Sequence, residues 1–159
     1  MPEPDATPVD PDVDPRLPDE HRAARPGPWP VLAVIAVGGI IGAESRFGLQ
    51  HAFPHPPGGF AWATFWINIS GCLLLGVLMV LVTRVWPGRA LLRPFLGVGV
   101  LGGFTTFSSY TLEVQQAVAA DHLQTAVAYA IGTLVAGLLA VWIGSTVTTA
   151  AVRRLGEGR

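Results

Sequence analysis

The sequence alternates between long apolar stretches and short polar segments. Four stretches contain no Asp, Glu, Lys or Arg: residues 26–43, 47–83, 94–112 and 123–152. A membrane-spanning helix needs about 20 consecutive, mostly apolar residues, and each stretch is long enough for one. We therefore predict an all-α protein of the cell membrane, surrounded by lipid, with four transmembrane helices at about residues 29–49, 61–82, 92–114 and 125–147.

Composition strengthens this prediction and excludes several classes of function. Half of the residues are hydrophobic and only 13% are charged, which a soluble domain of this length could not easily accommodate. The net charge of −1 offers no basic surface, so nucleic acid is not expected as a partner. The single cysteine, Cys72, rules out a disulfide framework or a cysteine metal site. Because no constellation of catalytic side chains is present, we do not expect an enzyme.

The polar segments divide the chain into a membrane domain and two tails. Residues 1–28 are rich in Pro and Asp and are predicted to be a disordered tail. Residues 29–150 form the predicted four-helix domain, and residues 151–159 a short basic tail. Nine of the ten arginines lie in the two tails or around the loop between the second and third spans. Because cytoplasmic segments are enriched in Arg, both termini are predicted to be cytoplasmic.

Small residues recur within the spans at the spacing that brings them onto one helix face. Examples are the pairs Gly38 and Gly42, and Gly99 and Gly103, and the series Ala136, Ala140 and Gly144. Such faces allow helix backbones to approach one another closely in a membrane, so we predict that these faces pack. The histidines at positions 51, 55 and 122 are expected in loops, too scattered for a metal site.

Polar residues inside spans are costly and mark places where function is expected. They form three clusters. GGIIGAESRF carries Glu44 and Arg46 near one membrane boundary, and ATFWINISGC places Thr64, Asn68 and Cys72 on one helix face. The third cluster, GGFTTFSSY, occupies residues 102–110 in the middle of the third span.

The third cluster predicts a break in its helix, because two glycines followed by Phe-Thr-Thr continue a helix poorly. A break within the membrane frees carbonyl oxygens, which must line a cavity, meet another chain or bind a cation. Beyond it, Phe107 and Tyr110 share a face, and the electropositive edges of their rings could contact a small anion. The hydroxyls of Thr106 and Ser108 and the amide of Asn68 would add uncharged donors.

Structural roles are also open for most of these residues. Serine and threonine hydroxyls in membrane helices often bond to their own helix, and a phenylalanine often faces lipid. Arg46 could extend to the headgroups, and Glu44 could pair with it. Asn68 is the exception, because an amide at mid-membrane needs partners, which favours a pore or an interface.

Taken together, these motifs resemble the Fluc (CrcB-like) family of fluoride channels. GGIIGAESR, TFWINISGCLLLG and GGFTTFSSY have the order and spacing of that family's three signature stretches, and YAIGTLVAGLLAVWIG is similar to its fourth helix. The resemblance covers about residues 31–144. It implies an antiparallel dimer with two fluoride pathways and a central sodium ion that is structural and not transported.

The resemblance also implies roles for individual residues. Carbonyls of Gly102 and Thr105 would hold the sodium ion. The implied fluoride pathway contains Arg46, Asn68, Phe107, Tyr110 and Thr133, beside Thr106 and Ser108. Two positions depart from the family's usual pattern: Tyr110 replaces the commoner Phe, and Thr133 replaces Ser.

The implied function is passive export of cytoplasmic fluoride, which reduces its toxicity. The alternative is a small multidrug-resistance-type exporter, coupled to protons through a membrane carboxylate in the first helix, for which Glu44 is the only candidate. A membrane scaffold without transport would leave Asn68 and the broken span unexplained. The implied antiparallel dimer could form with this same chain or with a homologue of opposite orientation. The arginine bias opposes insertion of one chain in both orientations and therefore favours the homologue.

Overall fold

The computed structural model describes residues 26–56 and 58–157, and these are all helix, turn or loop. The predicted tail falls almost entirely on residues 1–25, outside the described residues. The helical elements are α1 (Pro28–Ala52), α2 (Trp62–Arg84), the π-helix η2 (Arg93–Leu101), α3 (Gly102–Phe104), α4 (Phe107–Ala119) and α5 (Leu123–Glu157).

The helices confirm the predicted all-α, multi-pass membrane protein. Four segments are long and apolar enough to cross a membrane: Pro28–Ala52, Trp62–Arg84, Arg93–Ala119 and Leu123–Gly156. Each agrees with a predicted span but is longer. At about 1.5 Å per residue, the 35-residue α5 measures about 52 Å, against about 30 Å for the hydrocarbon of a bilayer. Residues 151–157 continue this helix, which is longer than the hydrocarbon of a bilayer is thick.

The placement of His51 in a loop was wrong. His51 belongs to the last turn of α1, where its ring stacks on Phe47 with centroids 6.2 Å apart. Its exposed side chain lies at the helix end, so the helix simply continues for a few residues past the apolar stretch.

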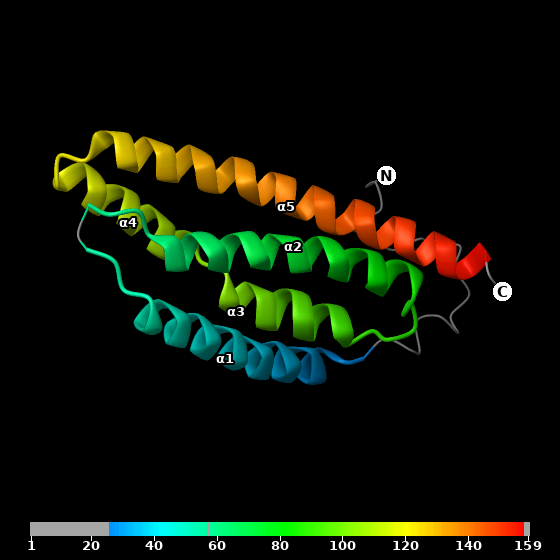
Figure 1. Cartoon of the computed structure of the whole chain (residues 1–159). Coiled ribbons are helices and arrows are strands. Elements are labelled where there is room, and N and C mark those ends of the chain that lie inside the picture. The colour runs from blue at the N-terminus through cyan, green and yellow to red at the C-terminus, as the bar shows by residue number, and fades with distance from the viewer. Residues whose placement is uncertain (1–25, 57, 158–159) are drawn as a thin grey trace, which may run out of the picture.

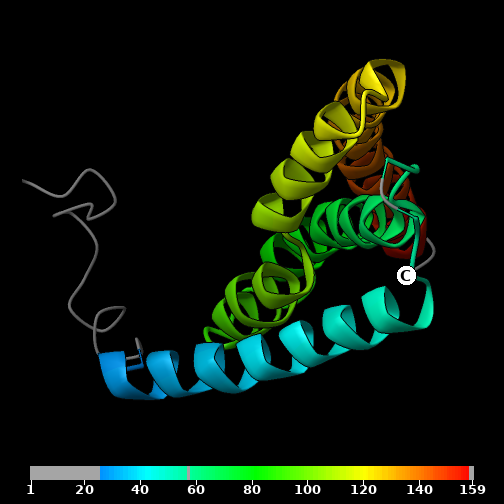
Figure 2. The same cartoon turned by 90° about the vertical axis from the view of Figure 1, so that its left-hand side faces the viewer.

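The helices are arranged with α2 and η2 between two outer groups. Figure 1 shows α5 lying along α2 for most of its length, while α1 lies beside η2 and α3. From the end of the bundle, α1 and the α4–α5 pair lie on opposite sides of α2 and η2 (Figure 2). The first helix consequently packs mainly on the third span and makes few contacts with α2, its neighbour in sequence.

The predicted close packing at small residues is confirmed. A Cβ on Gly38 would lie 2.5 Å from the Phe95 carbonyl oxygen, and one on Gly42 would overlap the Val100 carbonyl oxygen. On the opposite side of the bundle, a Cβ on Gly144 would overlap the carbonyl oxygen of Leu73 in α2. All three contacts are with backbone atoms, so no side chain can move aside to admit a larger residue.

The third span changes its backbone conformation three times. It starts as the π-helix η2, a form that is rare beyond a single turn and that is frequent at functional sites. It continues as α3, after which Thr105 (ψ 156°) and Thr106 (φ −148°, ψ 125°) are extended, and α4 begins at Phe107. Two consecutive non-helical residues thus lie inside a span flanked by helix on both sides.

Candidate functional site

The extended backbone at Thr106 is paired with the side chain of Asn68. The amide nitrogen of Asn68 donates to the Thr106 carbonyl oxygen at 3.0 Å, and the Thr106 N–H donates to the Asn68 amide oxygen at 2.9 Å. Asn68 therefore satisfies a backbone unit that has left the helix, as a buried polar group requires. One N–H of the amide remains for another acceptor.

Thr106 also caps the helix that follows. Its hydroxyl accepts from the Ser109 N–H at 3.1 Å and lies 3.2 Å from the Ser108 hydroxyl. A threonine at this position is a favoured N-cap, which explains why α4 restarts at Phe107. Thr106 is buried, whereas Ser108 is exposed and lies beside the cap.

The interruption alters the surroundings of the two predicted sodium ligands. In a continuous α-helix the Gly102 carbonyl would accept from the Thr106 N–H, but that N–H goes to Asn68. Thr105 retains helical bonds, since its N–H and hydroxyl both donate to Leu101 at 2.9 Å. Gly102 is exposed. Among the described residues no cluster of three His, Cys, Asp or Glu side chains could hold a metal.

A groove of about 650 Å³ runs from the interruption to α5. It is lined by α2, the third span and α5, and none of its lining residues is charged. The groove brings together seven of the nine predicted site residues, which are Asn68, Gly102, Thr105, Thr106, Phe107, Tyr110 and Thr133. Cys72 also lines it. Thr64, Asn68 and Cys72 had been predicted to share one helix face, and both Asn68 and Cys72 face this groove.

The two predicted aromatic residues lie side by side in the groove. The ring centroids of Phe107 and Tyr110 are 5.6 Å apart, and 79% of Phe107 is exposed. On its other side Tyr110 meets the ring of Tyr129, also at 5.6 Å. The Tyr110 phenol, expected to need a partner, donates to the Ala130 carbonyl oxygen of α5 at 2.9 Å.

Two further predicted residues carry buried polar atoms without a partner. The hydroxyl of Thr133, whose residue is 8% exposed, makes no hydrogen bond, and neither does the Nε of Arg46. Thr133 lines the groove, so its donor is available to a small acceptor there. Arg46 and Glu44 lie on α1, outside the groove, and the Glu44 side chain is exposed.

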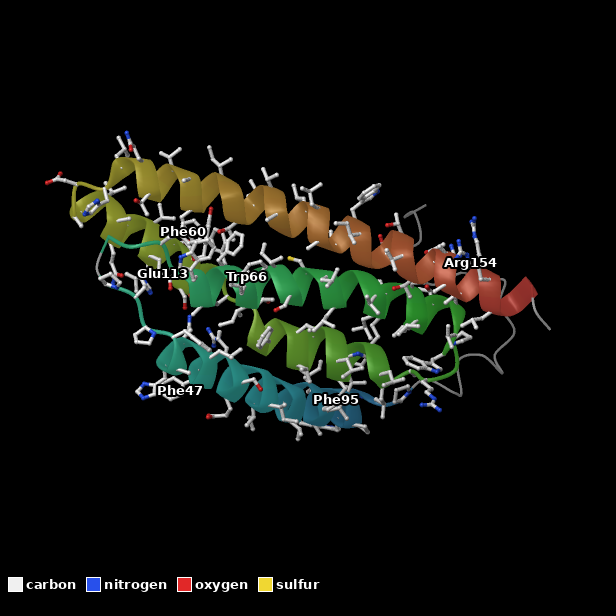
Figure 3. All side chains as sticks on the ribbon, in the orientation of Figure 1. Phe47, Phe60, Trp66, Phe95, Glu113 and Arg154 are labelled. Atoms are coloured by element: carbon white, nitrogen blue, oxygen red, sulfur yellow. The ribbon has the colours of Figure 1, made fainter. Side chains whose placement is uncertain are left out.

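Glu44 is the one carboxylate of α1, but a further carboxylate, which the sequence analysis did not single out, lies in another membrane-spanning helix. Glu113 lies within the third span, Arg93–Ala119, where it accepts from the Thr64 hydroxyl at 2.6 Å and from the Tyr129 hydroxyl. Gln50 of α1 donates in turn to Thr64 at 3.0 Å. These bonds link α1, α2, α4 and α5 at the end of the bundle where Figure 3 labels Glu113 and Phe60. Since the predicted third span extended to residue 114, it contained this carboxylate, and its position was the signal that could have found it.

The side chains of the groove can contact a small, weakly held anion. Their polar groups are an amide, hydroxyls and the Cys72 thiol, and no carboxylate lines the groove. Donors of this kind can replace part of a hydration shell without the strong attraction of a fixed positive charge. Basic side chains gather elsewhere, as at Arg154 near the far end of α5 (Figure 3).

Comparison with known proteins identifies the family. The model of the CrcB-like protein family, Camphor Resistance (CrcB), matches residues 33–145. The fluoride-specific ion channel FluC 2 of Streptomyces avermitilis is 49% identical over 125 residues, which cover 79% of each chain. FluC 1 of Streptomyces coelicolor is 47% identical over 116 residues, covering 73% of this chain and 75% of its own. The chain therefore belongs to the CrcB-like family.

Proposed function

We propose that this protein is a fluoride-specific ion channel. The observation that carries the proposal is the uncharged groove in which Asn68, Phe107, Tyr110 and Thr133 meet, within a chain about half identical to proteins named fluoride-specific ion channels. Fluoride is the smallest halide and the strongest hydrogen-bond acceptor among them. A lining of neutral donors and ring edges suits it, because these groups can replace water and still release the ion.

The remaining donors define how the ion is passed along. The free N–H of Asn68 and the unpartnered hydroxyl of Thr133 come from two different helices that line the groove, α2 and α5. Phe107 and Tyr110 of α4 supply ring edges to the same groove. Arg46 belongs to a vestibule at the pathway's entrance, where its positive charge raises the local concentration of anions.

No energy source is required for export. Hydrogen fluoride crosses membranes as a neutral acid and loses its proton in a less acidic cytoplasm, which traps the anion inside. With the interior negative, an anion that leaves gains about 2.3 kcal/mol per 100 mV. A passive pore is then sufficient to lower the toxic concentration of cytoplasmic fluoride.

The proposed assembly is an antiparallel dimer around a structural sodium ion. Carbonyls of Gly102 and Thr105 from both subunits would hold the ion, whose charge offsets their partial negative charges. The diversion of the Thr106 N–H to Asn68 supports this, because it leaves the Gly102 carbonyl without its helical partner. Irregular backbone at membrane depth is a recurrent sodium site in transport proteins.

The test is release of fluoride from liposomes. Purified protein is reconstituted into vesicles loaded with potassium fluoride or potassium chloride, a potassium ionophore balances the charge, and ion-selective electrodes follow each anion. We expect rapid release of fluoride and no measurable release of chloride. A chain that releases neither anion, or both equally, would refute the proposal.

Orientation decides which partner completes the dimer. Arg84, Arg89, Arg93, Arg153 and Arg154 all belong to one side of the predicted topology, together with both termini. This bias supports cytoplasmic termini and a second homologue of opposite orientation as the native partner. Numbered relatives such as FluC 1 and FluC 2 are in keeping with paralogues. Reporter fusions at the C-terminus in the native host test this: a single cytoplasmic signal requires a partner, whereas a mixed population supports a homodimer.

A further inference from the structure

Arginines gather at the end of the bundle where α2 and α5 finish. Three lie between the end of α2 and the start of η2, two lie in the last turns of α5, and all five side chains are exposed: Arg84, Arg89, Arg93, Arg153 and Arg154. Figure 3 labels Arg154 at the opposite end of the bundle from Glu113. In these two segments the sequence sets five arginines against one carboxylate, Glu157, so they form a strongly positive surface.

The packing of α2 on α5 brings their arginines to the same depth. A Cβ on Gly76 of α2 would meet backbone atoms of α5, and one on Gly144 of α5 would meet backbone atoms of α2 on both sides of Gly76. The two helices run in the same direction (Figure 1), with these glycines nearly level. Arg84 follows Gly76 by eight residues and Arg153 follows Gly144 by nine. Both arginines therefore lie about 12–14 Å further along their helices.

This depth corresponds to a membrane boundary. Arg84 ends one of the four apolar segments that can cross a membrane, and Arg93 begins the next. Between them the half-buried ring of Trp86 lies 5.9 Å from the guanidinium of Arg89. Tryptophan is enriched where the hydrocarbon of a bilayer meets its headgroups. The arginines at this depth consequently face the headgroup layer.

The two arginines of α5 stand at one end of a hollow along that helix. Arg153 and Arg154 line a hollow of about 440 Å³, whose other lining residues are small and come from the preceding turns: Ser145, Thr146, Thr149 and Ala150. The hydroxyls of Ser145 and Thr146 both donate to the Trp142 carbonyl oxygen, so these two donors are used within the helix. The hollow therefore offers cations at its end and small side chains towards the interior of the membrane.

We propose that Arg153 and Arg154, with the hollow that precedes them, bind the headgroup of an anionic phospholipid. The phosphate oxygens of the headgroup accept hydrogen bonds from the guanidinium groups, and the first carbons of an acyl chain lie beside the small side chains. Clusters of arginines at the ends of membrane helices recognise anionic lipids in this way. A choline headgroup fits less well, because its cation is repelled by the arginines. This site is separate from the uncharged groove and does not depend on fluoride conduction.

The test is native mass spectrometry of the full-length protein in detergent, titrated with phosphatidylglycerol or with phosphatidylcholine of identical acyl chains. The wild type should bind phosphatidylglycerol more tightly. Each arginine near an anionic headgroup contributes about fivefold in affinity (about 1 kcal/mol), so a double variant, Arg153→Gln with Arg154→Gln, should bind it about 25-fold more weakly. Equal affinity of the wild type for the two lipids, or an unchanged affinity in the double variant, would overturn the inference.

Two controls separate the headgroup from other causes. Gly156→Ala changes no charge, and its Cβ meets nothing within 4 Å, so its affinity for phosphatidylglycerol should equal that of the wild type. An excess of inorganic phosphate should leave the lipid bound, because a free anion lacks the contacts of the acyl chain. Complete displacement of the lipid by phosphate would show a site for free anions and would contradict the proposal.

Thermal midpoints distinguish lipid binding from a contact within the protein. Phosphatidylglycerol should raise the midpoint of the wild type more than that of the double variant, since a ligand stabilises the folded state that binds it. The other occupant to consider is the N-terminal segment, because seven of the eleven acidic residues lie in residues 1–25. If the double variant differed from the wild type equally with and without phosphatidylglycerol, the arginines would serve such an internal contact and the lipid site would be refuted.

Discussion

Removal of the Asn68 amide should destabilise the extended backbone at Thr106 in the third span and slow fluoride release. In Asn68→Ala, the Thr106 N–H and carbonyl lose their partners at 2.9 Å and 3.0 Å. Thr106 is 8% exposed, so water cannot readily replace the amide. The variant also removes the amide N–H that the proposed pathway offers to the ion.

The magnitude follows from these bonds. An unsatisfied buried donor or acceptor costs about 1–3 kcal/mol. If the lost bonds raise the free energy of the conducting conformation by this amount, fluoride release slows by about 5- to 150-fold, since about 1.4 kcal/mol corresponds to a factor of ten. Phe107→Ile, which keeps volume and removes the ring, should also slow release, but without affecting the bonds at Thr106.

The assay is fluoride release from vesicles at equal protein density, with the oligomeric state compared by size exclusion. Ser70→Ala is a matched control on the same helix, because the Ser70 hydroxyl bonds only to carbonyls of its own helix. It should conduct like the wild type. Normal release by both Asn68→Ala and Phe107→Ile would refute the assignment of these residues to the pathway.

Three further predictions concern the cation and the packing. Replacement of all sodium by a large organic cation should abolish fluoride release. Thr105→Ser should reduce fluoride release only slightly, because a backbone carbonyl is the proposed sodium ligand. Full fluoride release without sodium would refute the proposed sodium site. Thr64→Val loses a bond to a carboxylate worth about 1.5–3 kcal/mol, so its thermal midpoint should fall by about 3–10 °C. Thr83→Val, whose hydroxyl bonds within its own helix, should stay within about 2 °C, and equal shifts would contradict the reasoning. Gly42→Ala forces a methyl group into the η2 backbone and should destabilise the protein by about 1–3 kcal/mol or more. The control Gly39→Ala, with open space at its Cβ, should leave the thermal midpoint unchanged. An unchanged midpoint in Gly42→Ala would contradict the packing.

The sequence allowed the spans and most of the groove to be predicted. Charge-free stretches located all four spanning helices, because a helix that crosses a bilayer must be long and mostly apolar, and both properties are visible in the sequence. The spacing of Asn68 and Cys72 placed both on the face that lines the groove. Their partners could not be predicted, because the pairing of Asn68 with Thr106 joins residues 38 positions apart.

The form of the third span, the full length of α5 and the carboxylate of Glu113 were not predicted from the sequence. Nothing in RPFLGVGVL distinguishes a π-helix from an α-helix, although η2 packs mainly on α1 in the structure. The fourth span was predicted to end at about residue 147, whereas α5 continues to Glu157 past Arg153 and Arg154, because charged residues can end an apolar stretch without ending a helix. Glu113 was overlooked because it immediately follows a charge-free stretch and was treated as its boundary.

The packing of α1 on the third span, and hardly on α2, has a consequence for biogenesis. Helices leave the translocation machinery in the order of synthesis, so α1 enters the bilayer before its main partner exists. Its glycine face must remain against lipid until η2 and α3 follow. In a membrane, helices form first and associate afterwards, which makes such a waiting stage possible. Chains truncated after α2 should accordingly leave α1 unassembled and open to membrane quality-control proteases, so stable accumulation should begin only once residues beyond Phe104 have been inserted.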